Sequence, residues 1–212
     1  VDSAQDLLPV SMEVFKPAAN SVPTSRGRML YLLDQAAGAV HAAHLANFGK
    51  VDLSRDLALE KGGGARWIVR LKSVVMCPED GVYRLALNCR DAGFVWVDGE
   101  PAAEWPGEHD AGDWQTGPPL SLKAGPHRIE VLNMARSPIV VRLGWTLPGG
   151  DEVVPIPHAS LLTARDVLDP RFETMTKPMQ PDFAFTVMPA YSLRGGSVAF
   201  IPVSFTNTTQ YW

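Results

Sequence analysis

The chain has 212 residues, of which 46% are hydrophobic and 20% are charged, and its formal net charge is −4. This length suffices for one large β domain, or for one domain with part of another. No cluster of Lys and Arg accompanies the negative charge, which argues against a nucleic-acid partner, because phosphate binding needs clustered cations. No apolar run approaches the roughly 20 residues that span a bilayer, so we expect no membrane insertion.

The first 48 residues divide into two parts. Residues 1–27 are polar and dotted with proline, and we interpret them as an N-terminal arm with one short strand at residues 11–15. Residues 28–48 support two alternatives. Met29, Leu32 and Leu33 fit one face of a helix, which the alanine content also favours, whereas residues 29–33 and 39–45 could form two strands. The family resemblance described below favours strands.

A period of two dominates the middle of the chain. Such a period sends alternate side chains to a core and leaves the others facing solvent or a second layer. Turns rich in Gly, Pro and Asp separate the alternating segments, and residues 94–97 are apolar on both faces, which predicts a central strand. The pattern predicts an all-β sandwich or barrel. The expected core positions are Trp67, Val69, Leu71, Tyr83, Leu85, Leu87, Cys89, Ile139, Val141, Leu143 and Trp145.

The two cysteines, Cys77 and Cys89, are predicted to be free. If residues 78–81 form the turn between two strands, Cys77 lies beside the turn and Cys89 lies far along the second strand. At ~3.3 Å per residue their separation is roughly 20 Å, and a disulfide needs Cα atoms within about 7 Å. We therefore expect two packed thiols.

Four phrases follow one another in the alternating region. They are Asp-Gly-Val-Tyr (80–83), Val-Asp-Gly (97–99), Lys-Ala-Gly-Pro-His (123–127) and Leu-Gly-Trp (143–145). The Asp-Gly steps permit the positive φ of tight hairpin turns. This ordered set resembles the carbohydrate-binding domain first described in anthrax protective antigen. The resemblance implies a protective-antigen-like β-sandwich over residues 28–163 and binding at a cell surface rather than catalysis.

The resemblance also raises the question of calcium. In sugar-binding members of that family, two successive aspartates before the Val-Asp-Gly strand hold a calcium ion against the sugar hydroxyls. The matching positions here are Arg90 and Asp91. Calcium takes six to eight oxygen ligands, usually with several carboxylates, and an arginine at the first position would repel it. We expect no metal at Asp91, and we expect Arg90 to pair with a nearby carboxylate.

Residues 101–119 read as a long loop that carries the other candidate ligand-binding residues. These are Trp105, His109, Asp110, Asp113 and Trp114, which we group with Asp91. An indole face can stack on a sugar ring while carboxylates accept hydrogen bonds from its hydroxyls. Alternatively, both tryptophans fold back and close the end of the sandwich. Long loops of this kind are uncommon and often functional.

Nothing else in the chain indicates catalysis or a cofactor. His41 and His44 have no third metal ligand at a useful spacing, and the other histidines are scattered without a nucleophile to serve. Paired acids for sugar hydrolysis could meet in the 101–119 loop, but no second feature supports a hydrolase. We predict no enzyme activity, no cofactor and no metal.

After residue 163 the pattern changes. Prolines mark residues 164–182 as a linker, and two strand-like phrases follow within residues 183–212. The segment from Gly195 to Thr209 resembles the first two strands of an immunoglobulin-like domain of the polycystic-kidney-disease type. The resemblance implies the start of a second β module, because two strands cannot bury a core alone.

The leading functional hypothesis is a non-catalytic glycan-binding or adhesion module of a secreted or cell-surface multidomain protein. The alternative is a structural or interaction domain that binds another protein subunit in a larger assembly and touches no sugar. The exposure of the two loop tryptophans, Trp105 and Trp114, should discriminate between them. Exposed indoles beside carboxylates favour a glycan, and indoles buried in the fold or against another chain favour assembly.

Overall fold

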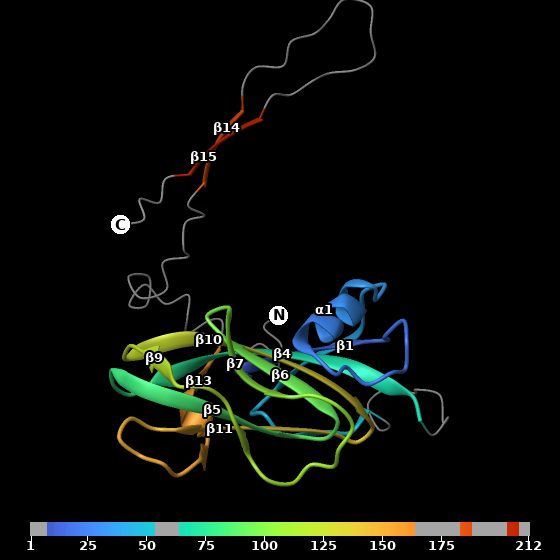
Figure 1. Ribbon diagram of the computed structural model, residues 1–212, viewed down its shortest axis with the longest axis horizontal. Coiled ribbons are helices and arrows are strands. Elements are labelled where there is room, and N and C mark those ends of the chain that lie inside the picture. Colours follow the sequence, from blue (N-terminus) through green and yellow to red (C-terminus); the bar gives the residue numbers. More distant parts are fainter. Residues whose placement is uncertain (1–7, 54–63, 164–182, 188–202, 208–212) are drawn as a thin grey trace, which may run out of the picture. The chain divides into compact units, whose positions relative to one another are not determined.

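A computed structural model describes residues 8–53, 64–163, 183–187 and 203–207 of the protein. The chain divides into two compact units, Val1–Met175 and Thr176–Trp212. Within the described residues, the first unit has two layers of β-strands and an α-helix, α1 (Arg26–Asp34) (Figure 1). No helix within the described residues is long and apolar enough to cross a membrane.

The first sheet of this unit holds seven strands within the described residues, and all its pairings are antiparallel. The N-terminal arm predicted for residues 1–27 contributes a strand to the sandwich, because β1 (Val10–Phe15) lies between β2 (Ala39–Leu45) and β4 (Arg66–Cys77). In spatial order the strands are β2 (Ala39–Leu45), β1 (Val10–Phe15), β4 (Arg66–Cys77), β10 (Gly125–Arg136), β6 (Ala92–Val97) and β7 (Glu100–Trp105), with β13 (Leu161–Leu162) paired to β4.

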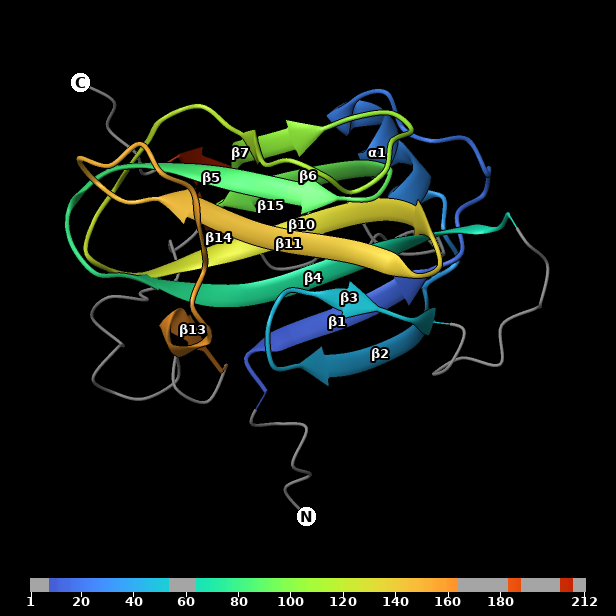
Figure 2. The same cartoon turned by 90° about the horizontal axis from the view of Figure 1, so that it is seen from below.

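The second sheet is built mainly from two long strands. Figure 2 shows β5 (Gly81–Cys89) and β11 (Ile139–Thr146) lying over β10 and β4, so the two sheets form two layers. A one-turn 3-10 helix, η2 (His158–Ser160), precedes β13. Six strands belong to this sheet in the part of the chain that is described: β12 (Val154–Pro155), β11 (Ile139–Thr146), β5 (Gly81–Cys89) and β8 (Gln115–Thr116) in order, with β3 (Lys50–Val51) beside β11 and β9 (Leu120–Leu122) beside β5.

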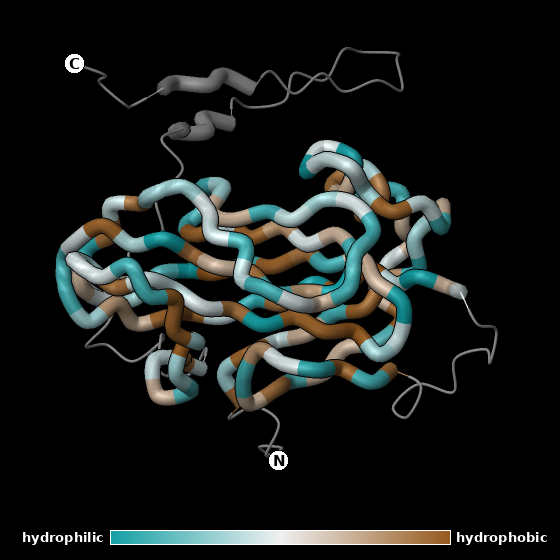
Figure 3. The backbone as a smooth tube through the Cα atoms, turned by 60° about the horizontal axis from the view of Figure 1, so that its bottom comes forward, coloured by the Kyte–Doolittle hydropathy of each residue, from teal (hydrophilic) through white to brown (hydrophobic). Residues whose placement is uncertain are grey.

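The main core lies between the sheets, and its residues follow the predicted period of two. On β5, Tyr83, Leu85 and Leu87 have at most 1% of their surface exposed. Figure 3 shows hydrophobic positions recurring along the central strands. The all-β fold class is confirmed, and the predicted core positions are buried with the exception of Trp67, which is half-buried. Cys77 and Cys89 are both buried and free, as predicted.

The strand interpretation of residues 29–33 is wrong, because this segment lies within helix α1. Ser25 caps the helix through its Oγ, which accepts a hydrogen bond from Arg28 N at 3.2 Å. Met29 and Leu32, three residues apart, are buried in a second cluster against the outer face of the first sheet. The strand interpretation holds for the following segment, β2. A cap at Ser25 and an apolar face at helical spacing therefore explain why a helix forms where the family resemblance favoured a strand.

The region predicted as a long loop is shorter than expected. Residues 100–105 form strand β7, and β8 adds two more paired residues, so the connection between them covers residues 106–114. The Ala-rich start of β7 buries Ala102 and Ala103 against the main core. The strand at residues 94–97 is internal to its sheet, with β10 on one side and β7 on the other, as predicted.

The second unit contains one described pair of strands. β14 (Phe183–Val187) and β15 (Val203–Asn207) pair antiparallel, with Phe185 opposite Phe205. The predicted linker, residues 164–182, lies outside the described residues, as do residues 188–202 of the proposed second module.

Candidate functional site

Asp91 occupies the turn that joins β5 of one sheet to β6 of the other. Its φ of 54° lies in the left-handed region, and none of its side chain is exposed. The side-chain amide of Asn133 holds this turn by donating to Arg90 O and Ala92 O, both at 2.9 Å. Asp91 N donates to His109 O at 2.9 Å. The turn is therefore fastened both to β10 and to the 106–114 loop.

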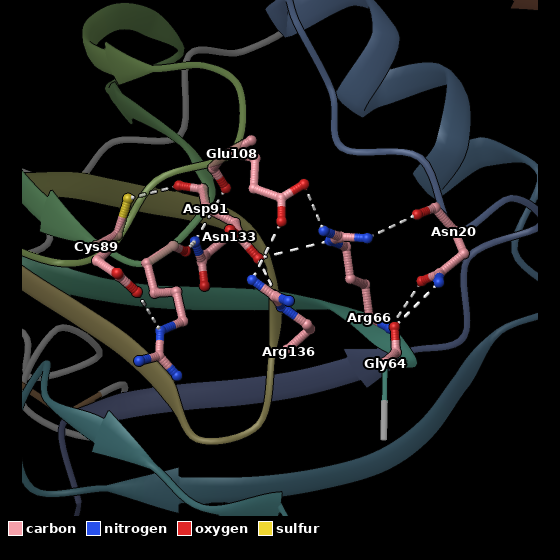
Figure 4. A network of polar contacts seen from close by, with 11 residues as sticks. Asn20, Gly64, Arg66, Cys89, Asp91, Glu108, Asn133 and Arg136 are labelled. Carbon is pink, nitrogen blue, oxygen red and sulfur yellow. Dashed lines mark hydrogen bonds and ion pairs between the residues drawn. The ribbon is translucent and has the colours of Figure 1, made fainter. Parts of the chain in front are cut away.

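Two guanidinium groups face the Asp91 carboxylate (Figure 4). Arg66 Nε lies 3.5 Å from Asp91 Oδ2, and Arg136 Nε lies 3.9 Å from the same oxygen. Neither carboxylate oxygen has a hydrogen-bond partner among the described residues, and the same is true of Asn133 Oδ1. The charge of Asp91 is balanced by these ion pairs, since a buried carboxylate is tolerated only when it is compensated.

The same two arginines hold the 106–114 loop through Glu108. Arg66 Nη2 lies 2.8 Å from Glu108 Oε2, and Arg136 Nη2 lies 3.2 Å from Glu108 Oε1. Asn20 orients Arg66 by accepting from its backbone N at 2.9 Å and from its Nη1 at 3.1 Å. We call Arg66, Asp91, Glu108 and Arg136 the arginine–carboxylate cluster.

Arg90 turns away from Asp91 and toward the loop. Its Nε lies 3.5 Å from Asp110 Oδ1, and 87% of the Asp110 side chain is exposed. The prediction that Arg90 pairs with a nearby carboxylate is confirmed. Such an exposed pair contributes little to stability, of the order of 0–1 kcal/mol.

Cys89, at the end of β5, is buried and packs against the turn that contains Asp91. Its thiol donates to Asp91 O at 3.3 Å. Burial, and secondarily the charge of Asp91, raises the pKa of Cys89 to about 12. This thiol is therefore protonated at neutral pH and has no nucleophilic role.

Trp105 and His109 stack on each other at the start of the 106–114 loop. Their ring centroids are 3.7 Å apart with an angle of 13° between the planes, and Trp105 also packs against the main core. His109 Nε2 lies 3.4 Å from Trp105 O. One face of this indole is therefore covered by the imidazole and is not free to stack on a ligand.

Trp114 lies at the other end of the loop, against β11. Its Cη2 is 3.3 Å from the position that a Cβ of Gly144 would take, so the glycine makes room for the indole. The preceding residue, Asp113, is exposed, and Asn88 of β5 donates to Gly112 O. Asp113 and Trp114 thus belong to the surface of β5 and β11 rather than to the arginine–carboxylate cluster.

Of the six candidate ligand-binding residues, the structure brings four together. Asp91, Trp105, His109 and Asp110 surround the turn between β5 and β6, whereas Asp113 and Trp114 lie apart from them. The sequence interpretation missed Arg66, Arg136 and Glu108. No local signal marks the two arginines, because they lie far apart in the sequence and meet only through the pairing of β4 with β10.

The residues around Asp91 do not fit a calcium ion. The unpartnered oxygens of Asp91 and Asn133 would suit a cation, but calcium needs six to eight oxygens at 2.3–2.6 Å. Two guanidinium groups already lie at 3.5 and 3.9 Å from Asp91 Oδ2. At an effective dielectric of about 20, a guanidinium ~4 Å from a dication repels it by about 8 kcal/mol, which cancels the attraction of one carboxylate at the same distance. No group of three or more His, Cys, Asp or Glu among the described residues could hold a metal ion.

Comparisons with known proteins identify the fold. No protein-family model matches the chain, and no curated protein matches it. Among solved structures, the PA14 domain of the MpAFP antifreeze protein is similar, with 17% identity and a TM-score of 0.56 over 76% of this chain and 94% of that domain. The PA14 sugar-binding domain from an RTX adhesin has 17% identity and a TM-score of 0.53 over 74% of this chain and 98% of that domain.

A third similar structure is an anti-sigma factor domain-containing protein, with 14% identity and a TM-score of 0.55 over 76% of this chain and 50% of that one. At these identities the likeness concerns the fold alone. The first unit therefore has a PA14-like β-sandwich fold, in agreement with the expectation from the sequence.

Proposed function

We propose that the first unit is a non-catalytic glycan-binding module of a secreted or cell-surface multidomain protein. The observation that carries the proposal is the 106–114 loop, which presents exposed Asp110 and Asp113 on a PA14-like scaffold. Exposed carboxylates accept hydrogen bonds from sugar hydroxyls. The partly exposed indole of Trp114 supplies an apolar surface next to Asp113, its neighbour in the chain. The sugar-binding adhesin domain of the same fold supports the assignment.

We assign Asp91 a supporting role in this site. Its carboxylate has no exposed surface and faces two guanidinium groups, so it cannot reach a sugar directly. It holds the loop through its backbone N and through the arginines that also bind Glu108. Trp105 and His109 act with it, since their stacked rings fill the base of the loop.

Binding to an immobilised glycan panel tests the proposal. Asp113→Asn removes a charge without removing side-chain volume, and Asp151→Asn is the matched control at another exposed aspartate. Loss of one charged hydrogen bond should weaken binding by about tenfold or more. Asp110→Asn is measured alongside. The proposal would be contradicted if the wild type bound no glycan, or if D113N and D110N each bound as tightly as the wild type.

The alternative function, protein–protein assembly, is favoured by strand β2. β2 forms an edge of the first sheet, it pairs only with β1 among the described residues, and it carries no Lys, Arg, Asp, Glu or Pro. The opposite edge strand, β7, carries Glu100, Pro101 and Glu104, which discourage strand addition. An uncharged edge can accept a strand from a partner. Light scattering of wild type and Ala42→Lys would detect such an association as a loss of mass in the variant.

We also propose that residues 183–212 begin a second β module of the immunoglobulin-like type. The antiparallel pairing of β14 with β15 supports this proposal. A two-stranded hairpin is at best marginally stable in water, so the module needs further strands or a partner. Amide exchange of this chain tests it: a hairpin that buries no core should exchange faster in β14 and β15 than β5 does, and equally slow exchange would contradict the proposal.

A further inference from the structure

Two guanidinium groups stand between a buried carboxylate and a loop carboxylate at one end of the sandwich. Arg66 lies 3.5 Å from Asp91 and 2.8 Å from Glu108, and Arg136 lies 3.9 and 3.2 Å from the same two acids. Figure 4 shows that both arginines point toward the carboxylates of Asp91 and Glu108. A divalent cation held by two carboxylates would make the same connection and carry the same total charge.

The sheet register makes this arrangement more than a surface ion pair. Arg66 and Arg136 are direct partners across the antiparallel pair of β4 and β10. Like charges at opposite positions of two strands destabilise their pairing. Asp91 and Glu108 offset that repulsion, so the four side chains form one electrically neutral unit. Removal of either type of charge leaves the other uncompensated, in part on a residue with no exposed surface.

On the buried side of the cluster Arg66 is held in place by neighbouring residues, and on the other side Glu108 is exposed on the loop. Asn20 holds Arg66 through two hydrogen bonds, and 12% of the Arg66 side chain is exposed. Glu108, with 56% of its side chain exposed, comes from the loop and completes the cluster. Next to it, Gly107 N donates to Pro23 O at 2.9 Å. Residue 109 is held by Asp91 N and by Trp105, and the positions of residues 107 and 108 depend on contacts with residue 23 and with the two arginines.

From these contacts we propose that Arg66 and Arg136 take the place of a divalent cation at Asp91 and fix residues 107 and 108 without any metal. The two arginines act as positioning residues, because their effect reaches the loop through Glu108. The proposal concerns the position of the loop and does not depend on glycan binding.

Hydrogen exchange of the Gly107 amide, measured by NMR on the whole chain, tests the proposal. The double variant Arg66→Met with Arg136→Met keeps side-chain length and removes both charges, and Arg142→Met on the exposed surface of β11 is the control. We expect exchange at Gly107 to accelerate by about tenfold in the double variant, as for the loss of a charge-assisted contact. Exchange within β5 should accelerate less than exchange at Gly107, because the uncompensated Asp91 destabilises the whole fold whereas release of the loop acts on Gly107 in addition. Equal acceleration at both places would contradict the role of the arginines.

The second arm measures the thermal midpoint of the wild type in chelator and in calcium at about 1 mM, where extracellular calcium modules are occupied. We expect the same midpoint in both. A rise of several degrees in calcium would overturn the replacement of metal, and unchanged exchange at Gly107 in the double variant would overturn the role of the arginines. If the double variant does not fold, two single variants of Arg136, whose side chain is 44% exposed, replace it. Exchange at Gly107 should accelerate in Arg136→Met and stay slow in Arg136→Lys, which keeps the charge.

Discussion

Replacement of Gly117 by alanine is the sharpest test of how the 106–114 loop is closed. A Cβ on Gly117 would lie 1.7 Å from Ala102 O and 3.0 Å from Ala103 Cα, and both atoms belong to the backbone of β7. Ordinary contact begins at 3.4 Å, so β7 and residue 117 must separate by about 1.7 Å. Gly117 N also donates to Leu85 O at 2.8 Å, which opposes that movement.

The expected cost follows from these contacts. Overpacking against atoms that cannot rotate away costs about 1–3 kcal/mol, and loss of a backbone hydrogen bond adds about 1 kcal/mol. Alanine restricts the unfolded chain, which returns about 0.4–1 kcal/mol. We expect the free energy of unfolding of Gly117→Ala to fall by about 2–3 kcal/mol, measured by urea denaturation.

Gly112→Ala is the matched control on the same loop. No atom lies within 4 Å of its Cβ position, and its φ lies outside the left-handed region. This variant should unfold at the urea midpoint of the wild type or slightly above it. Equal midpoints for the two variants would refute the close approach of Gly117 to β7 and, with it, the described closure of the loop.

Three further predictions concern the charged turn, the thiols and the core. The hydrogen bond to the Asp98 carboxylate raises the pKa of His127. Burial raises the pKa of Asp98, but the hydrogen bonds that it accepts from His127 and from Arg128 N outweigh burial, so the pKa of Asp98 is lowered. Their contact at 2.6 Å therefore stabilises the fold between about pH 3.8 and 6.5, declining as pH rises through the pKa of His127, so His127→Ala should cost most near pH 5 in pH-dependent urea titrations. Burial raises the pKa of Cys77 to about 11 and of Cys89 to about 12, so neither should react with a thiol reagent at pH 8 before unfolding. Leu87→Ala should lower the free energy of unfolding by about 2–5 kcal/mol, and a smaller loss would contradict its full burial.

Local patterns determined most of the scaffold. The alternation along residues 83–89 and 139–145 was sufficient to predict which faces are buried, because a strand has only two faces and one of them must leave water. The separation of Cys77 and Cys89 followed from the length of one strand. The family pattern favours strands at residues 29–33, but the Met29–Leu32 spacing and a cap at Ser25 favour the helix that the structure shows at Arg26–Asp34.

The candidate site was predicted only in part. Aromatic and acidic residues concentrate in residues 101–119 and indicate the loop, whereas the family resemblance alone pointed to Asp91. That Trp105 is covered by His109, and that Trp114 lies against Gly144, depended on how the loop packs. The sequence was compatible with either exposed or buried tryptophans at these positions. Only the packing of the loop decides how much of each indole is covered.

The sequence by itself determined that the first unit is a β-sandwich and that an arginine, Arg90, stands beside Asp91. Only the tertiary structure decided what balances Asp91. Arg66 and Arg136 become neighbours through the register of β4 and β10, and Glu108 reaches them from a different sheet edge. Electrostatic interactions depend on distance in space, and the distances within this cluster are set by strand pairing and not by separation along the chain.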